Sequence, residues 1–427
     1  MAWLSAVGGL VTVWGLVLWL HRRDLLALWR EPLLRVPTLI VESDDWGPGP
    51  ESDTATLDIL RELLQGFRDA RGRHPVMTLG VILGIPDGAK IRAAAGRAYE
   101  RLSLADAAFA GLRGAMERGV AAQVFAPQLH GGEHFWPASV RAVAERDPAV
   151  AAWLQAEDLP NAQDLPSPLQ SRWTDAATLP SRPLRRDALR DAAREEVAEF
   201  RRTFGRSPAV VVPPTFLWTG EVERAWASSG VRWVVTPGRR NVARDAQGGL
   251  VPEGPALRNA EQAESGVRYL VRHRYFEPAL GHKAEKVIGD LARDRRLGRP
   301  TLLETHRANF VGDPARVEAA RAELARALTR ALEVHPDLRF LSTEELGESL
   351  LSGAPDLVDP RFCRRARVWL DRAAEVPRLP KLTLATGLVA VWAVLHGLTG
   401  LCQARRLFHG PCGGDGQVTN HSASNAT

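Results

Sequence analysis

The chain has 427 residues, enough for one large α/β domain or for two domains of ordinary size. Hydrophobic residues make up 45% of the sequence, which is normal for a folded core and excludes a largely disordered chain. The formal net charge of +5 comes almost entirely from arginine, and basic residues alternate with acidic ones along the predicted helices, so we predict no nucleic-acid partner. The three cysteines form no CxxC pair, which indicates neither a disulfide framework nor a thiolate zinc site.

The chain begins with an apolar segment. Residues 2–20 carry no charge, are long enough to cross a bilayer at roughly 20 residues per span, and are followed by Arg22 and Arg23. A cleaved signal peptide needs its positive charge before the apolar part and a small-residue cleavage site after it. Here the charge follows the segment and no such site is evident. We therefore predict an uncleaved membrane anchor over residues 1–23.

Between residues 36 and 350, short apolar runs alternate with amphipathic helical patterns. The strand candidates are Thr38–Glu42, Val76–Ile82, Ala121–Ala126, Ala209–Pro213, Val231–Thr236, Val267–Val271, Thr301–Thr305 and Leu338–Ser342. The helix candidates are Ser52–Arg71, Ser103–Arg118, Pro137–Gln155, Arg186–Phe204, Glu221–Ser229, His282–Leu297 and Pro314–His335. Strands that alternate with helices indicate βαβ units and a parallel sheet. The number of units favours a barrel over the alternative, a doubly wound open sheet.

Two segments interrupt this alternation. Residues 159–183 are rich in Pro, Asp and Ser, and residues 237–265 are rich in Gly, Arg and Pro. Loops of this length in a compact domain are typical of lids over a functional site or of variable insertions.

The C-terminal part differs from the middle. We predict a linker over residues 351–381, a second membrane span over residues 382–402, and a disordered tail over residues 403–427. A buried or interfacial helix is the alternative for residues 382–402. Two spans would leave the middle of the chain on one side of the membrane, and the flanking basic residues indicate the cytoplasmic side of the inner membrane. No oligomeric state is predicted.

Two adjacent carboxylates, Asp44 and Asp45, follow the first predicted strand. Side chains at successive positions of a strand point to opposite faces. One of the pair could therefore bind a metal while the other stays free as a base, although capping of the following helix is an equally good interpretation. Glu42 shares a face with Asp44, and we expect like-charge repulsion between them to raise the pKa of Asp44.

Histidines 130 and 134 follow the third predicted strand, with a spacing that lets two imidazoles bind one cation. The same residues with Glu133 match the inverted zincin pattern of some metalloproteases, which requires a helix. Gly131 and Gly132 together cost a helix roughly 2 kcal/mol relative to alanine, so we predict a loop and treat the protease as the secondary interpretation.

Two further strand ends carry candidate residues. His306 follows Thr301–Thr305 beside the polar side chains Arg307 and Asn309, although a buried structural histidine is the alternative for His306. Phe216 lies in a run of prolines and aromatics after another strand, which suits the wall of a sugar-sized groove or plain packing.

In their order along the chain, these motifs resemble those of the polysaccharide deacetylases with the NodB-type fold, over residues 36–350. The motifs are Asp44-Asp45, His130-x-x-x-His134 and Leu303-x-x-His306, each after a predicted strand. The resemblance implies a distorted (β/α)7-type barrel with parallel strands, here flanked by terminal hydrophobic segments. It also implies that Asp45, His130 and His134 hold a divalent metal of the zinc type.

The resemblance further implies that Asp44 is the catalytic base and His306 the catalytic acid. Trp46, Phe216, Arg307 and Asn309 are then the predicted substrate-binding residues. The family usually carries an Arg-x-Pro motif whose arginine orients the base, but residues 211–214 contain no arginine. Arg272, Arg274 or Arg307 could take its place.

The predicted function is removal of an N-acetyl group from a sugar of a polysaccharide or a lipid-linked glycan at the membrane. We expect the metal to hold and activate the attacking water, and a backbone N–H near Phe216 to stabilise the oxyanion. The missing arginine leaves open a binding protein that has lost catalysis. A glycoside hydrolase that uses paired carboxylates without a metal is a further alternative.

Overall fold

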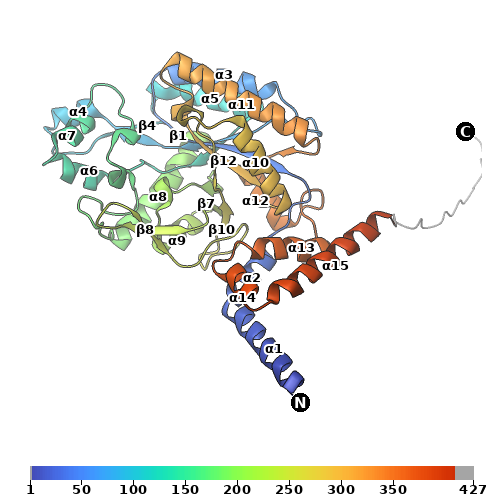
Figure 1. Cartoon of the computed structure of the whole chain (residues 1–427). Coiled ribbons are helices and arrows are strands. Elements are labelled where there is room, and N and C mark those ends of the chain that lie inside the picture. Colours follow the sequence, from blue (N-terminus) through green and yellow to red (C-terminus); the bar gives the residue numbers. More distant parts are fainter. Residues whose placement is uncertain (1, 409–427) are drawn as a thin grey trace, which may run out of the picture. The chain divides into compact units, whose positions relative to one another are not determined.

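The computed structural model describes residues 2–408, with the environments of side chains described for residues 7–400. The chain forms two compact units (Figure 1). The larger unit is residues 30–359 and covers the predicted barrel over residues 36–350. The smaller unit is built from segments at the two ends, within residues 1–29 and 360–427.

The larger unit is organised around one sheet whose neighbouring strands are all parallel. In spatial order the strands are β10 (Arg268–Val271), β7 (Trp233–Thr236), β6 (Val210–Val211), β5 (Phe125–Leu129), β2 (Met77–Val81), β1 (Thr38–Trp46), β12 (Thr301–His306) and β11 (Arg274–Tyr275), and β13 (Arg339–Phe340) also pairs with β1.

The sheet curves so that its two edges meet. β10 and β11 stand at opposite ends of the spatial order, yet β10 ends at Val271 and β11 begins at Arg274. The chain therefore crosses from one edge to the other through Arg272 and His273 alone. An α/β sheet of parallel strands with this closure confirms the predicted fold class, a distorted (β/α)7-type barrel.

Helices follow most strands and surround the sheet (Figure 1). The helices after the strands are α3 (Ser52–Gln65), α5 (Ala110–Ala121), α8 (Arg186–Phe204), α9 (Gly220–Ser228), α10 (Ala284–Arg296), α11 (Pro314–Val334) and α12 (Thr343–Ser352). The start of α11 is as predicted, because the carboxylate of Asp313 accepts a hydrogen bond from the N–H of Arg316 at 2.9 Å and Pro314 occupies the first turn.

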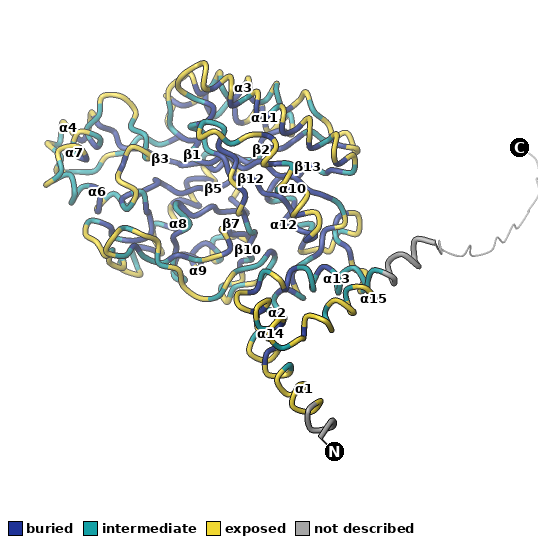
Figure 2. Tube along the Cα trace, in the orientation of Figure 1, coloured by how far each residue is buried: buried dark blue, intermediate teal, exposed yellow. Residues whose placement is uncertain are grey.

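The strands are buried on both faces, as a parallel sheet covered by helices requires (Figure 2). Successive residues of β1 enter two different apolar clusters. Leu39 and Val41 pack with Leu57, Leu79 and other residues in one cluster, whereas Ile40 packs in the second. A strand is present within or overlapping each of the eight predicted ranges, because apolar runs buried on both faces leave a signal in the sequence, although β6 and β13 are only two residues long.

Several predicted elements differ from the observed ones. The strand predicted at Ala121–Ala126 begins later, because Ala121 is the last residue of α5. The helix predicted at Pro137–Gln155 is two helices, α6 (Pro137–Ala144) and α7 (Pro148–Leu154), because Asp147 caps the second and Pro148 opens it.

Two antiparallel hairpins and a short helix were not predicted. The hairpins pair β3 (Gly84–Pro86) with β4 (Arg101–Ser103) and β8 (Arg240–Arg244) with β9 (Leu250–Glu253), and the helix is α4 (Gly88–Ala93). The second hairpin lies within residues 237–265, where frequent arginine, glycine and proline conceal the strand period.

The smaller unit consists of helices only, within the described residues. They are α1 (Ala2–Leu20), α2 (Arg22–Arg30), α13 (Phe362–Ala373), α14 (Leu379–Ala385) and α15 (Leu388–Phe408). Its apolar cluster includes Val17, Leu28, Val376 and Leu379. Cys363 is disulfide-bonded, which the spacing of the cysteines had not indicated.

In the part of the chain that the structure describes, no single helix meets the length and hydropathy needed to span a bilayer. One bent pair, Leu379–Ala385 with Leu388–Gly400, meets that requirement jointly, with a bend of 105°. The span predicted over residues 382–402 is thus not one straight helix, since the chain turns at Gly387, whose φ is +71°. The predicted N-terminal anchor over residues 1–23 stays a prediction.

Two predicted boundaries need correction. The segment predicted as a linker over residues 351–381 contains the helix α13. The tail predicted as disordered over residues 403–427 begins inside α15, which continues to Phe408, and the remainder lies outside the described residues.

Candidate functional site

The carboxyl end of β1 carries a bulge that changes the direction of Asp45. The pairing of β1 with β2 shifts register between Ser43 and Trp46, and the φ of Asp45 is +69°, in the left-handed region. On a regular strand Asp44 and Asp45 would point to opposite faces. The bulge instead lets both carboxylates line the same cavity. Strained backbone of this kind is concentrated at functional sites in proteins.

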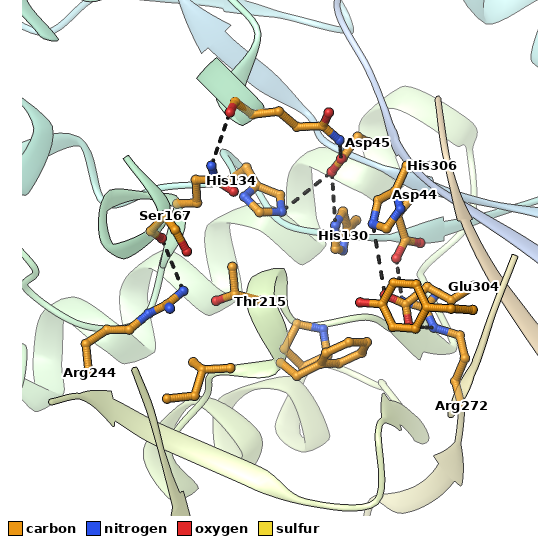
Figure 3. A pocket seen from close by; sticks show the side chains of 16 residues that line it. Asp44, Asp45, His130, His134, Ser167, Thr215, Arg244, Arg272, Glu304 and His306 are labelled. Carbon is orange, nitrogen blue, oxygen red and sulfur yellow. Dashed lines mark hydrogen bonds and ion pairs between the residues drawn. The ribbon is translucent and has the colours of Figure 1, made fainter. Parts of the chain in front are cut away.

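Three residues form a candidate metal centre at this cavity. Ligand atoms of Asp45, His130 and His134 all lie within 4.8 Å of one another. Oδ1 of Asp45 lies 3.3 Å from Nε2 of His130 and 3.5 Å from Nε2 of His134 (Figure 3). Atoms that share one tetrahedral zinc ion at its usual bond lengths lie about 3.4 Å apart. The spacing therefore fits a single ion.

The hydrogen bonds around the triad also fit a cation. Nδ1 of His130 lies 2.8 Å from the carbonyl oxygen of Val212, which can only accept, so Nδ1 carries the proton and Nε2 presents a lone pair. That lone pair faces Oδ1 of Asp45, a buried oxygen without a hydrogen-bond partner among the described residues. Converging acceptors repel one another unless a cation or a proton lies between them. The donor set of two imidazoles and a carboxylate suits such an ion.

Burial and charge act differently on the two imidazoles. Burial and the neighbouring His130 and His306 lower the pKa of His134 to about 4, so it is neutral at pH 7 and free to bind a cation. Burial opposes protonation of His130 too, but Asp44 and Asp45 outweigh it and raise the pKa of His130. A cation at the triad would take the place of that proton.

The histidine motif lies in a loop between β5 and α6, as predicted. The side chain of Glu133 turns away from the cavity and forms ion pairs with Arg172 and Arg101. Glu133 is therefore a structural residue in this fold, and the arrangement does not support the secondary metalloprotease interpretation, which needs Glu133 as the general base.

Arg272 holds the second carboxylate, Asp44. Its Nη2 lies 2.5 Å from Oδ2 of Asp44, its Nη1 lies 2.9 Å from Oε2 of Glu42, and its Nε lies 3.3 Å from Oε2 of Glu304. These four side chains are almost completely buried. Of the three arginines considered from the sequence, Arg272 is the one that contacts the predicted base.

A close approach of backbone makes room for this carboxylate. A Cβ atom on Gly80 of β2 would lie 2.3 Å from Oδ1 of Asp44 and 3.2 Å from its Cα, so any larger residue at position 80 would displace Asp44.

The structure corrects the expected pKa of Asp44. Burial alone would raise it, but the charges of Arg272 and His130 outweigh burial and lower the pKa of Asp44 below its usual value. The predicted repulsion by Glu42 is offset because Arg272 lies between the two carboxylates and binds both. Asp44 is therefore ionised at neutral pH.

His306 has a carboxylate partner that the sequence did not indicate. Nδ1 of His306 lies 2.6 Å from Oε1 of Glu277, and the amide of Asn309 donates to the other oxygen of Glu277. Burial lowers the pKa of His306, but Glu277, Asp45 and Asp44 raise it to about 9. His306 is thus a cation at neutral pH.

Replacement of Glu277 with glutamine tests this assignment. In metal-free protein we expect the pKa of His306 to fall by roughly one pH unit or more, because the imidazolium loses a charged hydrogen-bond partner. Histidine NMR during a pH titration measures the change, with the His306 signal assigned from a His306→Gln variant. Glu253→Gln, on the exposed hairpin, is the control. An unchanged pKa in Glu277→Gln would contradict the assignment.

The five catalytic and metal-binding residues predicted from the sequence line one cavity of about 350 Å³ (Figure 3). The other lining residues are Gln163, Ser167, Gln170, Pro213, Thr215, Phe216, Arg244, Leu250, Arg272, Tyr275 and Glu304. Thr215 and Phe216 both have φ near +52°, a second strained segment at the cavity. The N–H of Phe216 donates to the carbonyl of Pro213 at 2.9 Å, so it is not free for the oxyanion role expected at this position.

Three predicted substrate-binding residues do not line the cavity. Trp46 is completely buried and its indole donates to Ser43 at 2.9 Å. The guanidinium of Arg307 is paired with Asp53 at 2.6 Å. The amide nitrogen of Asn309 donates hydrogen bonds to Glu277, to the hydroxyl of Thr305 and to the backbone carbonyl of His306. These hydrogen bonds and this ion pair hold the residues around the cavity, and a contact of the three side chains with a substrate stays a prediction.

The sequence analysis missed four residues at the site. Gln163 lies in the long segment 159–183 and donates to Oδ2 of Asp45 at 2.6 Å. Arg244 and Glu304 line the cavity, and Glu277 holds His306. Glu304 lies inside the Leu303-x-x-His306 motif at a position that the motif leaves open, and the other three belong to no motif. Only the placement of polar residues in long loops or at strand ends could have pointed to them.

No family model matches the chain, and no curated protein matches its sequence. Most of the solved structures that align with it are polysaccharide deacetylases and family 4 carbohydrate esterases, the family that the three motifs resemble.

A family 4 acetyl xylan esterase from Clostridium thermocellum in complex with a cobalt ion aligns with 75% of this chain and 94% of its own, at 10% identity and a TM-score of 0.33. A pseudoenzyme of the same family from Bacillus anthracis aligns over 73% and 66%, at 8% identity and a TM-score of 0.34. A 4-α-glucanotransferase from Thermococcus litoralis aligns over 75% of this chain but only 40% of its own, at 9% identity and a TM-score of 0.36. At identities of 8–10% and TM-scores of 0.33–0.36, these alignments do not establish an activity for this chain, and its activity is inferred from its own residues.

Proposed function

We propose that this protein is a metal-dependent hydrolase that removes an N-acetyl group from a sugar of a polysaccharide or a lipid-linked glycan. One observation carries the proposal, the convergence of Asp45, His130 and His134 on a cavity that also presents Asp44 and His306. Metal ligands, an ionised carboxylate and a cationic imidazole are the parts that hydrolysis of an amide requires.

Each residue then has one task. A divalent cation held by the triad, with zinc the type that these donors suit, would polarise the acetyl carbonyl and lower the pKa of the attacking water. Asp44 accepts a proton from that water while the oxygen atom of the water bonds to the carbonyl carbon. His306 donates a proton to the sugar nitrogen as the C–N bond breaks, which gives acetate and a free amine. Arg272 keeps Asp44 ionised and Glu277 keeps His306 protonated.

The cavity supports a sugar as the substrate. Its volume of about 350 Å³ is at the lower end of the range for small-molecule sites, which suits one sugar unit. Phe216, Tyr275 and Pro213 offer flat apolar walls, whereas Thr215 and Gln170 offer polar groups.

Attachment to a membrane is part of the proposal. The helix α1 exposes apolar side chains that include Val11, Leu16, Trp19 and Leu20, which is unusual for a helix in water. A membrane location with the larger unit in the cytoplasm would suit a lipid-linked glycan as substrate.

The test is hydrolysis by the full-length protein loaded with zinc. We expect release of acetate and primary amine in equal amounts from at least one N-acetylated oligosaccharide or lipid-linked N-acetyl sugar. A chelator should stop the release, and added Zn²⁺ or Co²⁺ should restore it. Glycan binding without amine release would instead identify a binding protein. Cleavage of glycosidic bonds that resists the chelator would identify a glycoside hydrolase.

A further inference from the structure

Arg244, at the end of β8, is a buried arginine in the wall of the cavity. Its side chain is held by neutral acceptors only, with Nε 2.9 Å from Oγ of Ser171 and the two terminal nitrogens 3.0 Å from the carbonyl of Gly248 and 3.2 Å from that of Ser167. Figure 3 shows Arg244 on the side of the cavity opposite Arg272 and Glu304.

Arg244 differs in this respect from the other buried arginines of residues 30–359. Each of the others forms an ion pair with at least one carboxylate, in the pairs Arg172–Glu133, Arg272–Asp44, Arg274–Asp294 and Arg299–Glu31. No carboxylate among the described residues lies within ion-pair distance of Arg244. The neighbouring Asp245 instead accepts from the backbone N–H groups of Gln247 and Gly249.

A buried charge without a partner is costly, so this arrangement requires an explanation. Burial lowers the pKa of Arg244, which shows that its surroundings do not favour the charged form. A guanidinium has five N–H donors, and three nitrogen atoms here make one hydrogen bond each, so two donors are left for a ligand. An arginine in a cavity wall with N–H donors left over is suited to bind a phosphate or a carboxylate.

We propose that Arg244 binds an anionic group of the substrate, and that the substrate is an N-acylated sugar bearing a phosphate or a carboxylate. The position of the acyl group at the metal triad rests on the proposed function, whereas the anion site is defined by Arg244 itself. Arg244 and the triad line the same cavity of about 350 Å³, and the proposal places the anionic group at one and the acyl group at the other. The anionic group of the substrate supplies the negative charge that no described carboxylate places beside Arg244. Neutral N-acetyl sugars are therefore expected to be poor ligands.

Calorimetric titration of the zinc-loaded full-length protein tests this inference without any need for hydrolysis. The probes are N-acetylglucosamine, its 1-phosphate, its 6-phosphate and the corresponding uronic acid. We expect the best anionic sugar to bind roughly 10- to 100-fold more tightly than the neutral sugar, as a charged hydrogen-bonded pair gives. Preference for a phosphate or for the uronic acid identifies which anion the site takes.

The variants Arg244→Gln and Arg244→Lys locate the preference. Arg244→Gln should bind anionic and neutral sugars within about threefold of each other, whereas Arg244→Lys should keep part of the preference, because it keeps the charge. Arg239→Gln removes an equal charge from an exposed position before the same hairpin and should behave as wild type. Thermal unfolding and zinc content establish that each variant is folded.

Two outcomes would overturn the inference. Equal binding of neutral and anionic sugars by the wild type would show that no anion is recognised. A preference that survives in Arg244→Gln would place the anion elsewhere, with the metal triad as the obvious site. Amine release plays no part in either outcome, so the anion site and the proposed hydrolysis stand or fall separately.

Discussion

Asparagine in place of Asp45 is expected to remove the bound metal and the hydrolytic activity together. Oδ1 of Asp45 faces both imidazoles, at 3.3 and 3.5 Å, and is the one anionic donor in the triad. A neutral amide is a weaker ligand, so a single substitution leaves two imidazoles to hold the ion. We expect kcat/KM to fall about a thousandfold, which corresponds to about 4 kcal/mol of lost transition-state stabilisation.

Two further variants separate ligation from proton transfer. Asp44→Asn should keep the metal and lose the activity, because Asp44 contacts Arg272 and not the triad. Asp58→Asn, at a partly exposed carboxylate of α3 that pairs with Arg118, should change neither. Metal content by mass spectrometry and amine release are measured for each protein. Full metal content in Asp45→Asn would contradict the assigned ligand set, and so would undiminished amine release in that variant.

The convergence of the candidate metal triad could be predicted from the sequence because it depends on simple geometry. Parallel strands end at the same edge of the sheet, so polar residues directly after β1, β5 and β12 lie close together whatever the details of the loops. Asp45 and His306 lie at the carboxyl ends of β1 and β12, and His130 directly follows β5. The apolar runs that mark these strands are buried on both faces, which makes them the strongest signals in the chain.

The arrangement of Asp44 and Asp45 depends on a local backbone conformation that the pattern of polar and apolar residues in the sequence does not reveal. Regular alternation predicts opposite faces for Asp44 and Asp45, whereas the bulge at Asp45 brings both to the cavity. The motif indicated two residues that both line the cavity, and the reason that both do so is the left-handed φ of Asp45.

Residues that tune the site come from short or irregular segments. Glu277 follows β11, which is only Arg274–Tyr275, and Arg244 ends a hairpin strand without regular alternation of polar and apolar residues. Such segments carry no hydrophobic period, so their residues cannot be assigned to a face from the sequence. Their positions follow from the tertiary fold, because the crossing from β10 to β11 fixes where Arg272 and Glu277 lie.

Because Arg272 lies at that crossing, it is the supporting residue whose replacement should lower the activity and the stability most. The chain passes from one edge of the sheet to the other at Arg272, so its guanidinium reaches Glu42 and Asp44 on β1 and Glu304 on β12. Lysine at this position keeps one charge but cannot bind two carboxylates as a planar fork. We expect Arg272→Lys to fold and to lose roughly 100-fold in kcat/KM.

The pH dependence distinguishes tuning of the base from a general structural effect. Arg272 lowers the pKa of Asp44, so its replacement should raise that pKa and move the acidic limb of the kcat/KM profile to higher pH. Arg272→Met should also destabilise the fold by about 3–5 kcal/mol, because three buried carboxylates lose their cation. Arg274→Lys, at a buried arginine that pairs with Asp294 outside the cavity, is the matched control and should leave the acidic limb in place. An acidic limb that stays fixed in Arg272→Lys would show that Asp44 is not the base that Arg272 holds ionised.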